Sequence, residues 1–215
     1  MTPERGGETP ARFIVLEGID GAGKSSQVDP LATWLSARGR RVVTCRDPGS
    51  TAVGDAIRAI LLDRRDLELD LTAEMLLYMA ARAQLVAEVI RPALARGAWV
   101  ISDRYLLANV VYQGHAGGLD AEAIRRVGAV ATGGLEPDLL LLLDIAPEAA
   151  GRRMTRPLDK LEDRGDDFRR RLRDGYRAEA ARHPDRIVVI DASGDVATVQ
   201  EAARAAIVER FAELR

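Results

Sequence analysis

The chain has 215 residues, 47% of them apolar, which is enough for one sizeable domain with a proper hydrophobic core. Its formal net charge of −2 excludes the strong positive field of proteins that bind nucleic acid or anionic membranes, so any anion site has to be local. Cys45 is the only cysteine, which excludes a disulfide framework, and its apolar surroundings predict a small buried core residue.

Residues 1–11 are rich in proline, glycine and charged side chains, and we expect a disordered tail there, followed by a single domain over residues 12–215. The tail has no apolar core of the kind found in signal peptides. No stretch approaches the roughly 18 apolar residues of a membrane helix. We therefore expect a cytoplasmic protein that binds neither membranes nor nucleic acid.

The first predicted strand, residues 12–18, is an apolar run that ends in a glycine-rich loop. Gly18, Gly23, Lys24 and Ser25 match the phosphate-loop pattern G-x-x-x-x-G-K-[ST], and the loop opens a predicted helix at residues 25–39, in which Pro30 predicts a kink. The backbone N–H groups of such a loop surround a phosphate, the lysine reaches the β- and γ-phosphates, and the serine binds magnesium. The predicted ATP-binding residues are Gly18, Ile19, Asp20, Gly21, Ala22, Gly23, Lys24, Ser25 and Ser26.

A second strand is predicted at residues 40–45, and helical periodicity follows at 51–63 and 72–97. Tyr78 and Arg82 are spaced i and i+4, so they share one face of the helix. They could stack on a nucleobase and donate to its carbonyl, or they could be a half-buried ring and a solvated charge. Arg58 is ambiguous in the same way.

The third strand, residues 98–103, ends at Asp103 and is followed by Arg104. A carboxylate that ends such a strand next to a phosphate loop is placed to hold a magnesium-bound water. Ser25 and Asp103 are therefore the predicted Mg²⁺ residues, and Arg104 is expected in the same crevice. A surface ion network is the alternative for Asp103 and Arg104.

Further strands are predicted at residues 138–145 and 186–191, and a final helix at 195–214. Five apolar runs separated by helices predict an open, five-stranded parallel sheet with helices on both faces, which binds ligands beyond the carboxyl ends of its strands. The basic stretch 152–165 is either a solvated helix face with paired charges or a short lid that closes over phosphates.

The sequence resembles the thymidylate kinase family from about residue 12 to the final helix. The family's EG-x-[DE]-G-A-G-K pattern matches residues 17–24, and its R-[ED]-P-G pattern matches residues 46–49. Its A-A-R-x-Q pattern matches residues 80–84. Its D-R-Y…Y-Q-G pattern matches residues 103–105 and 112–114. The resemblance implies a nucleotide kinase of the phosphate-loop class that uses ATP and Mg²⁺ to convert dTMP to dTDP and that forms a homodimer through its long helices.

The resemblance also implies roles for individual residues. Arg58 and Arg104 would hold the dTMP phosphate, Arg82 and Gln113 the thymine edge, and Tyr78 would stack on the base. Lys24 and the lid would neutralise the moving phosphoryl group. The substrate-binding residues are then Asp20, Asp47, Pro48, Arg58, Tyr78, Arg82, Arg104, Asn109, Tyr112 and Gln113, and the catalytic cations are Lys24, Arg104, Arg153, Arg156 and Lys160.

The chain departs from the family pattern at several positions. Tyr78 replaces the usual phenylalanine, and Ala108 and Asn109 replace a Ser or Thr pair near the base, which leaves the strictness of dTMP over dUMP open. Gly21 replaces an arginine that some relatives carry, so the lid would supply the catalytic cation. A phosphate-loop kinase of another pyrimidine nucleotide or small metabolite is the alternative function, followed by a regulatory ATPase. A GTPase is disfavoured because no N-K-x-D motif is present.

Overall fold

In the computed structural model of the chain, which describes residues 10–154 and 165–214, five strands form one parallel sheet in the order β2-β3-β1-β4-β5. The strands are β1 (Phe13–Glu17), β2 (Val42–Arg46), β3 (Trp99–Asp103), β4 (Leu139–Asp144) and β5 (Ile187–Asp191). All five apolar runs that predicted strands therefore form strands. The predicted tail, residues 1–11, lies mostly outside the described residues.

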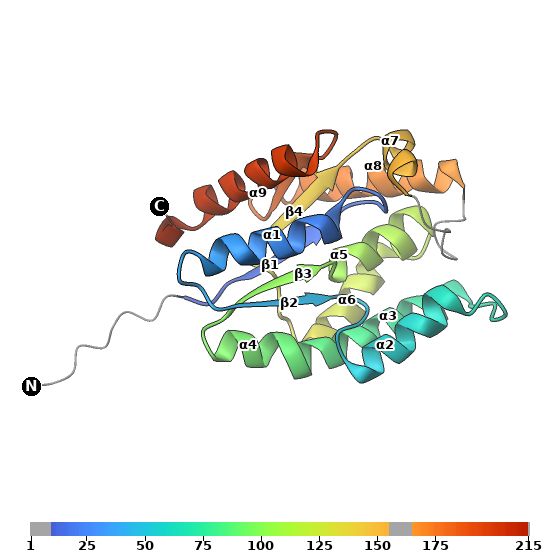
Figure 1. Cartoon of the computed structure of the whole chain (residues 1–215). Coiled ribbons are helices and arrows are strands. Elements are labelled where there is room, and N and C mark those ends of the chain that lie inside the picture. Colours follow the sequence, from blue (N-terminus) through green and yellow to red (C-terminus); the bar gives the residue numbers. More distant parts are fainter. Residues whose placement is uncertain (1–9, 155–164, 215) are drawn as a thin grey trace, which may run out of the picture.

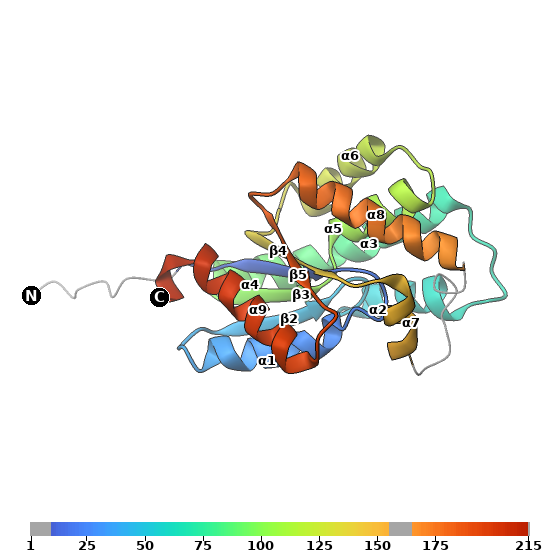
Figure 2. The same ribbon diagram turned by 90° about the horizontal axis from the view of Figure 1, so that it is seen from above.

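Helices cover both faces of the sheet, as predicted (Figures 1 and 2). Helices α1 (Lys24–Ser36) and α9 (Val196–Arg210) pack on one face. The segment η2 (Val86–Ile90) and α4 (Arg91–Ala95) pack on the other. Alternate side chains of β1 explain this arrangement, because Ile14 and Leu16 join the first cluster while Phe13 and Val15 join the second. The remaining elements are α2 (Ala52–Arg58), η1 (Ala59–Asp63), α3 (Leu71–Leu85), α5 (Leu106–Asn109), η3 (Val110–Ala116), α6 (Ala121–Thr132), α7 (Pro147–Arg153), α8 (Asp166–Arg182) and η5 (Ala212–Leu214).

The predicted helix over residues 72–97 is interrupted by one wider turn. Helix α3 runs into the π-helical turn η2 before α4 begins, and Pro92 stands in the first turn of α4. Proline lacks an N–H group, so Pro92 cannot donate the i→i−4 hydrogen bond of an α-helix. The wider π-helical turn lies just before this missing hydrogen bond. Pro30, by contrast, lies inside an unbroken α1.

The carboxyl ends of β1 and β3 lie side by side, because the two strands pair directly with Leu16 opposite Asp103. The loop after β1 and the loop after β3 therefore meet at one edge of the sheet, where the strand topology places ligand sites. Cys45 is buried on β2, as expected of a core residue. Among the described residues, no helix is both long and apolar enough to cross a membrane.

Candidate active site

The loop between β1 and α1 has the backbone that its glycines predict. Gly21 and Gly23 both have positive φ angles, and α1 begins at Lys24, so the loop leads directly into a helix N-terminus. Gly21 also lies against α7, since a Cβ atom at position 21 would stand 2.3 Å from the carbonyl oxygen of Ala150. The arginine that some relatives carry at this position would require α7 to move.

Lys24 folds back over this loop. Its Nζ donates to the carbonyl oxygens of Gly18 at 3.0 Å and Ile19 at 2.9 Å, and the residue is only 7% exposed. Burial, together with the nearby Arg104 guanidinium, lowers the pKa of Lys24 from its usual value. The two carbonyl bonds hold the ammonium group at the loop, where a phosphate could replace them.

Ser25 and Asp103 meet at the start of α1. The Ser25 hydroxyl donates to Oδ2 of Asp103 at 2.6 Å, across the pairing of β1 with β3. A hydroxyl and a carboxylate are hard oxygen ligands, and Mg²⁺ is typically held by one or two protein groups together with substrate phosphates. The described residues contain no group of three or more His, Cys, Asp or Glu side chains that could hold a metal, so this pair fits magnesium better than a metal with an all-protein ligand set.

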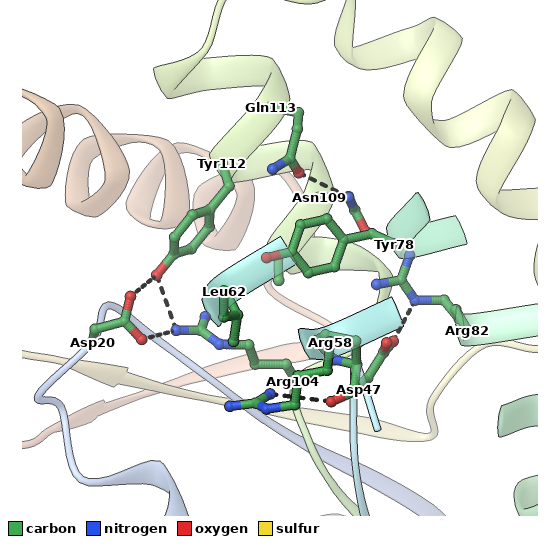
Figure 3. A pocket seen from close by; sticks show the side chains of 12 residues that line it. Asp20, Asp47, Arg58, Leu62, Tyr78, Arg82, Arg104, Asn109, Tyr112 and Gln113 are labelled. Carbon is green, nitrogen blue, oxygen red and sulfur yellow. Dashed lines mark hydrogen bonds and ion pairs between the residues drawn. The ribbon is translucent and has the colours of Figure 1, made fainter. Parts of the chain in front are cut away.

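A cavity opens beside the phosphate loop and brings together side chains from segments far apart in the chain (Figure 3). All ten residues predicted to bind substrate line it. Leu62 also lines the cavity and was not predicted from the sequence. Ala108 was named there only as a position that departs from the family pattern. The lining residues are Asp20, Asp47, Pro48, Arg58, Leu62, Tyr78, Arg82, Arg104, Ala108, Asn109, Tyr112 and Gln113.

Arg82 is buried at the wall of this cavity, so the interpretation of a solvated charge on an amphipathic helix is wrong. Arg82 is 1% exposed. Its Nε donates to Asp47, and its Nη2 donates to the carbonyl of Tyr105 at 3.2 Å. Its Nη1 donates to the sulfur of Met79, at 3.2 Å. Because a thioether is a weak acceptor, this nitrogen could exchange that contact for a ligand carbonyl.

A row of three buried polar side chains forms another wall. Asn109 donates through Nδ2 to Gln113 at 2.8 Å, and Gln113 donates through Nε2 to Glu74 at 2.8 Å. The Oδ1 atom of Asn109 is buried and has no hydrogen-bond partner among the described residues. A buried acceptor without a donor is costly, so a ligand N–H group that reached this atom would satisfy it.

Arg104 links the cavity to the phosphate loop. Its φ angle is +72°, a left-handed conformation that non-glycine residues rarely adopt and that marks functional positions. Nη1 donates to Gly18 O and to the Tyr176 hydroxyl, both at 3.0 Å, and Nη2 donates to Asp20 and, at 2.9 Å, to the Tyr112 hydroxyl. Burial alone would raise the pKa of Asp20, but the positive charges of Arg104 and Lys24 hold this pKa well below its usual range.

Arg58 reaches the same cavity from the end of α2, where its Nη1 donates to the carbonyl of Pro48 at 3.1 Å. Thr51 begins this helix by accepting a hydrogen bond from the N–H group of Gly54. The guanidinium groups of Arg58 and Arg104 therefore line the cavity together with that of Arg82 and with the ring of Tyr78. Such a set can hold a phosphate at one end and an aromatic base at the other.

A second, open cavity lies on the other side of the phosphate loop. It is lined by Gly21, Ala22, Gly23 and Ser26, and by Gly194 and Asp195 from the loop between β5 and α9. Arg153 borders it and donates to the carbonyl oxygens of residues 192, 193 and 194 at 2.8–2.9 Å. In the described structure Arg153 thus holds this loop. The predicted lid residues Arg156 and Lys160 lie outside the described residues.

No role was predicted for two residues behind Arg104, namely Glu17 and Tyr176. Glu17 is fully buried at the end of β1, and burial raises its pKa to about 6. Its Oε2 accepts a hydrogen bond from the Tyr176 hydroxyl at 2.9 Å. A carboxylate at the end of an apolar strand was a usable signal, whereas nothing in the surroundings of Tyr176 in the sequence indicated its partners.

Comparison with known proteins gives one family. The family model described as thymidylate kinase matches residues 16–203. The thymidylate kinase of Chromohalobacter salexigens is 49% identical over 208 residues, which cover 95% of this chain and 98% of that protein. The thymidylate kinase of Rhodopirellula baltica is 46% identical over 192 residues, which cover 89% of this chain and 78% of that protein.

A solved structure agrees with the sequence comparisons. The crystal structure of thymidylate kinase from Ehrlichia chaffeensis superposes with a TM-score of 0.76 at 27% sequence identity. The match covers 93% of this chain and 99% of that one. The predicted fold class, a parallel five-stranded sheet of the phosphate-loop nucleotide kinase type, is thereby confirmed.

Proposed function

The chain belongs to the thymidylate kinase family, and from this membership we propose that it transfers the γ-phosphoryl group of ATP to dTMP, giving dTDP and ADP. One observation carries the proposal beyond the family comparison. A cavity with two aromatic rings, buried amide groups and three arginines adjoins a phosphate loop, and Arg104 contacts both. The alternative functions, a kinase of another small molecule or a regulatory ATPase, are not favoured.

We assign the thymine base to the end of the cavity formed by Tyr78, Asn109 and Gln113. The Tyr78 ring supplies a surface for stacking, and the unsatisfied Oδ1 of Asn109 is an acceptor for the N3–H group of thymine. Nη1 of Arg82 is the donor for a base carbonyl, because its contact with Met79 is weak. Asn109, which together with Ala108 stands in place of the Ser or Thr pair, thus recognises the pyrimidine edge with Gln113.

We assign the dTMP phosphate to Arg58 and Arg104, at the end of the cavity nearest the phosphate loop. Four of the five N–H groups of Arg104 already donate to acceptors in the protein. These bonds hold the guanidinium group in place, and its positive charge still attracts a phosphate. The phosphate would therefore meet the Nε–H group and the fixed positive charge. Tyr112 and Asp20 then stand beside the sugar, while Asp47 holds Arg82.

On the donor side, residues 18–26 would surround the phosphates of ATP, and the second cavity would take the nucleoside between the phosphate loop and Gly194. Lys24 would exchange its two carbonyl bonds for phosphate oxygens. Ser25 and Asp103 would hold Mg²⁺, which when bound neutralises phosphate charge and orients the phosphates. We propose Mg²⁺ as the cofactor on the chemistry of these two oxygen donors.

The transfer itself needs positioning and charge neutralisation more than acid–base chemistry. An oxygen of the dTMP phosphate forms a bond to the γ-phosphorus while the bond from that phosphorus to the bridging oxygen of ADP breaks. The attacking oxygen is already anionic, so no strong base is required. Lys24, Arg58 and Arg104 offset the repulsion between the two substrates, and we keep Arg153, Arg156 and Lys160 as proposed cations from the basic segment 152–165.

We further propose a single kinase domain that forms a homodimer in the cytoplasm. Exposed apolar side chains support the dimer: Val53 on α2, Leu76 on α3 and Val130 on α6 are 47%, 49% and 83% exposed. These three helices form one layer, since α3 contacts both α2 and α6. Exposed apolar side chains on adjoining helices suit contact with a second copy of the chain.

The proposed function is tested by ADP release in a coupled assay across a panel of nucleoside monophosphates, with and without Mg²⁺. We expect dTMP to stimulate ADP release most strongly, and only with the metal. The proposal is wrong if dTMP gives no more ADP than buffer while another monophosphate does. Lys24→Ala is the control for the site, because its loss of turnover shows that ADP arises at the phosphate loop.

A further inference from the structure

Tyr176 lies behind the cavity, on α8, and does not line it. The residue is 1% exposed, and its hydroxyl group makes two bonds of opposite kind. It donates to Oε2 of Glu17 at 2.9 Å and accepts from Nη1 of Arg104 at 3.0 Å. The tyrosine oxygen therefore stands between a buried carboxylate and the guanidinium group that we assign to the dTMP phosphate.

Glu17 and Arg104 are close enough to attract each other directly. Their nearest charged atoms are 4.0 Å apart, and the Glu17 side chain is completely buried. A buried carboxylate without a donor is strongly unfavourable, so it would draw in the nearest cation if its present donor were lost. The Tyr176 hydroxyl supplies that donor and occupies the space between the two charges.

The other oxygen of Glu17 is fixed independently of Tyr176. Oε1 accepts from the backbone N–H groups of Tyr105 at 2.9 Å and Ala108 at 3.2 Å, in the segment that follows Arg104. The carboxylate thus cannot move away when the hydroxyl is removed. Arg104 is the group left to move, toward Glu17 and away from the cavity.

The position of Tyr176 depends on a close approach between helices. At the preceding residue, Gly175, a Cβ atom would stand 2.7 Å from Cβ of His115 on η3. Helix α8 therefore packs closely against η3, and this contact sets how deep the Tyr176 ring reaches. Burial, with the charge of Glu17, raises the pKa of Tyr176 well above its usual value, so the hydroxyl keeps its proton.

From this geometry we infer that Tyr176 is a positioning residue for the proposed kinase reaction: its hydroxyl separates Glu17 from Arg104 and keeps the Arg104 guanidinium turned toward the phosphate of the acceptor nucleotide. The inference rests on the proposed function, because it needs Arg104 at a substrate phosphate. It assigns Tyr176 no contact with either substrate.

The test compares dTMP with thymidine, which has the same base and sugar but no phosphate, in binding to the purified full chain by calorimetry. In Tyr176→Phe we expect the affinity for dTMP to fall about tenfold, the scale of one hydrogen bond to a charged group, while the affinity for thymidine changes less than about twofold. A general loosening of the structure would weaken both ligands alike. An unchanged ratio of the two affinities overturns the inference.

Tyr105→Phe is the matched control, since Tyr105 is an equally buried tyrosine whose hydroxyl donates to Leu135 O, away from Arg104. We expect it to keep the wild-type ratio of dTMP to thymidine affinity, and a fall equal to that of Tyr176→Phe overturns the inference. If Tyr176→Phe does not fold, Gly175→Ala gives the same test. It keeps every functional group and favours the helix, but its methyl group pushes α8 from η3, and the same selective loss is expected.

The wild-type protein separates this inference from the proposed function. If it binds dTMP no more tightly than thymidine, or prefers a different monophosphate, the proposed function fails and the inference with it. If the wild type shows the expected preference and Tyr176→Phe leaves it unchanged, the inference alone fails.

Discussion

The guanidinium of Arg82 and the carboxylate of Asp47 form an ion pair at the wall of the nucleotide cavity, and neither side chain is more than 1% exposed. The two residues come from α3 and from the loop after β2, 35 positions apart. Because removing one partner of a buried pair leaves an uncompensated charge, Arg82 contributes to the fold as well as to base recognition.

Arg82→Ala should therefore lower the free energy of unfolding by about 3–5 kcal/mol, and not only weaken dTMP binding. Arg58→Ala is the control, because Arg58 donates to the backbone carbonyl of Pro48 and its loss should cost about 1 kcal/mol. Urea unfolding monitored by circular dichroism measures both. Equal losses of stability in the two variants would show that the Arg82–Asp47 pair does not support the fold.

Ser25→Ala should raise the Mg²⁺ concentration needed for half-maximal turnover by about tenfold, since the hydroxyl and Asp103 are the proposed metal residues. Ser36→Ala, an exposed serine at the other end of α1, should leave the Mg²⁺ dependence unchanged. Titration of Mg²⁺ at saturating ATP and dTMP measures this. Identical Mg²⁺ curves for wild type and Ser25→Ala would count against the assignment.

Glu17 should make the stability of the protein fall as pH rises from about 4.5 to about 6. Burial raises its pKa from 4.5 to about 6, so between these values the folded state binds more protons than the unfolded state. The shift corresponds to about 2 kcal/mol, lost once the buried carboxylate has to ionise.

The measurement is urea unfolding of wild type and Glu17→Gln at several pH values. Groups such as Asp20, whose pKa is lowered, contribute slopes of the opposite sign, so the difference between the two proteins isolates Glu17. We expect the wild type to lose about 2 kcal/mol relative to Glu17→Gln across this range. A difference that stays constant or increases with pH would refute the assignment of a raised pKa.

Arg153→Ala should raise the Michaelis constant for ATP about tenfold and leave that for dTMP unchanged, because Arg153 holds the loop at residues 192–194 that borders the donor cavity. Arg152→Ala, a neighbouring exposed arginine, should behave like wild type. Steady-state kinetics with each substrate varied decide the point. A large fall in kcat with both Michaelis constants kept would instead support a catalytic cation at position 153.

Much of this architecture could be predicted from the sequence, because strands buried on both faces appear as continuous apolar runs and the phosphate loop is a local pattern. The cavity residues were predicted only through the family resemblance, since Arg58 and Arg82 look like ordinary helix charges. What the sequence could not show were contacts between distant segments: Arg82 with Asp47, Glu74 with Gln113, and Tyr176 with Glu17. Each depends on how helices pack, and no local spacing encodes it.

The central claim is that one site joins ATP to dTMP, and chromatography of the products tests it most directly. With ATP, Mg²⁺ and dTMP, we predict that dTDP and ADP form in equal amounts, and that dTMP is converted faster than any other nucleoside monophosphate offered at the same concentration. The claim is contradicted if ADP accumulates without dTDP, or if another monophosphate is phosphorylated in preference to dTMP.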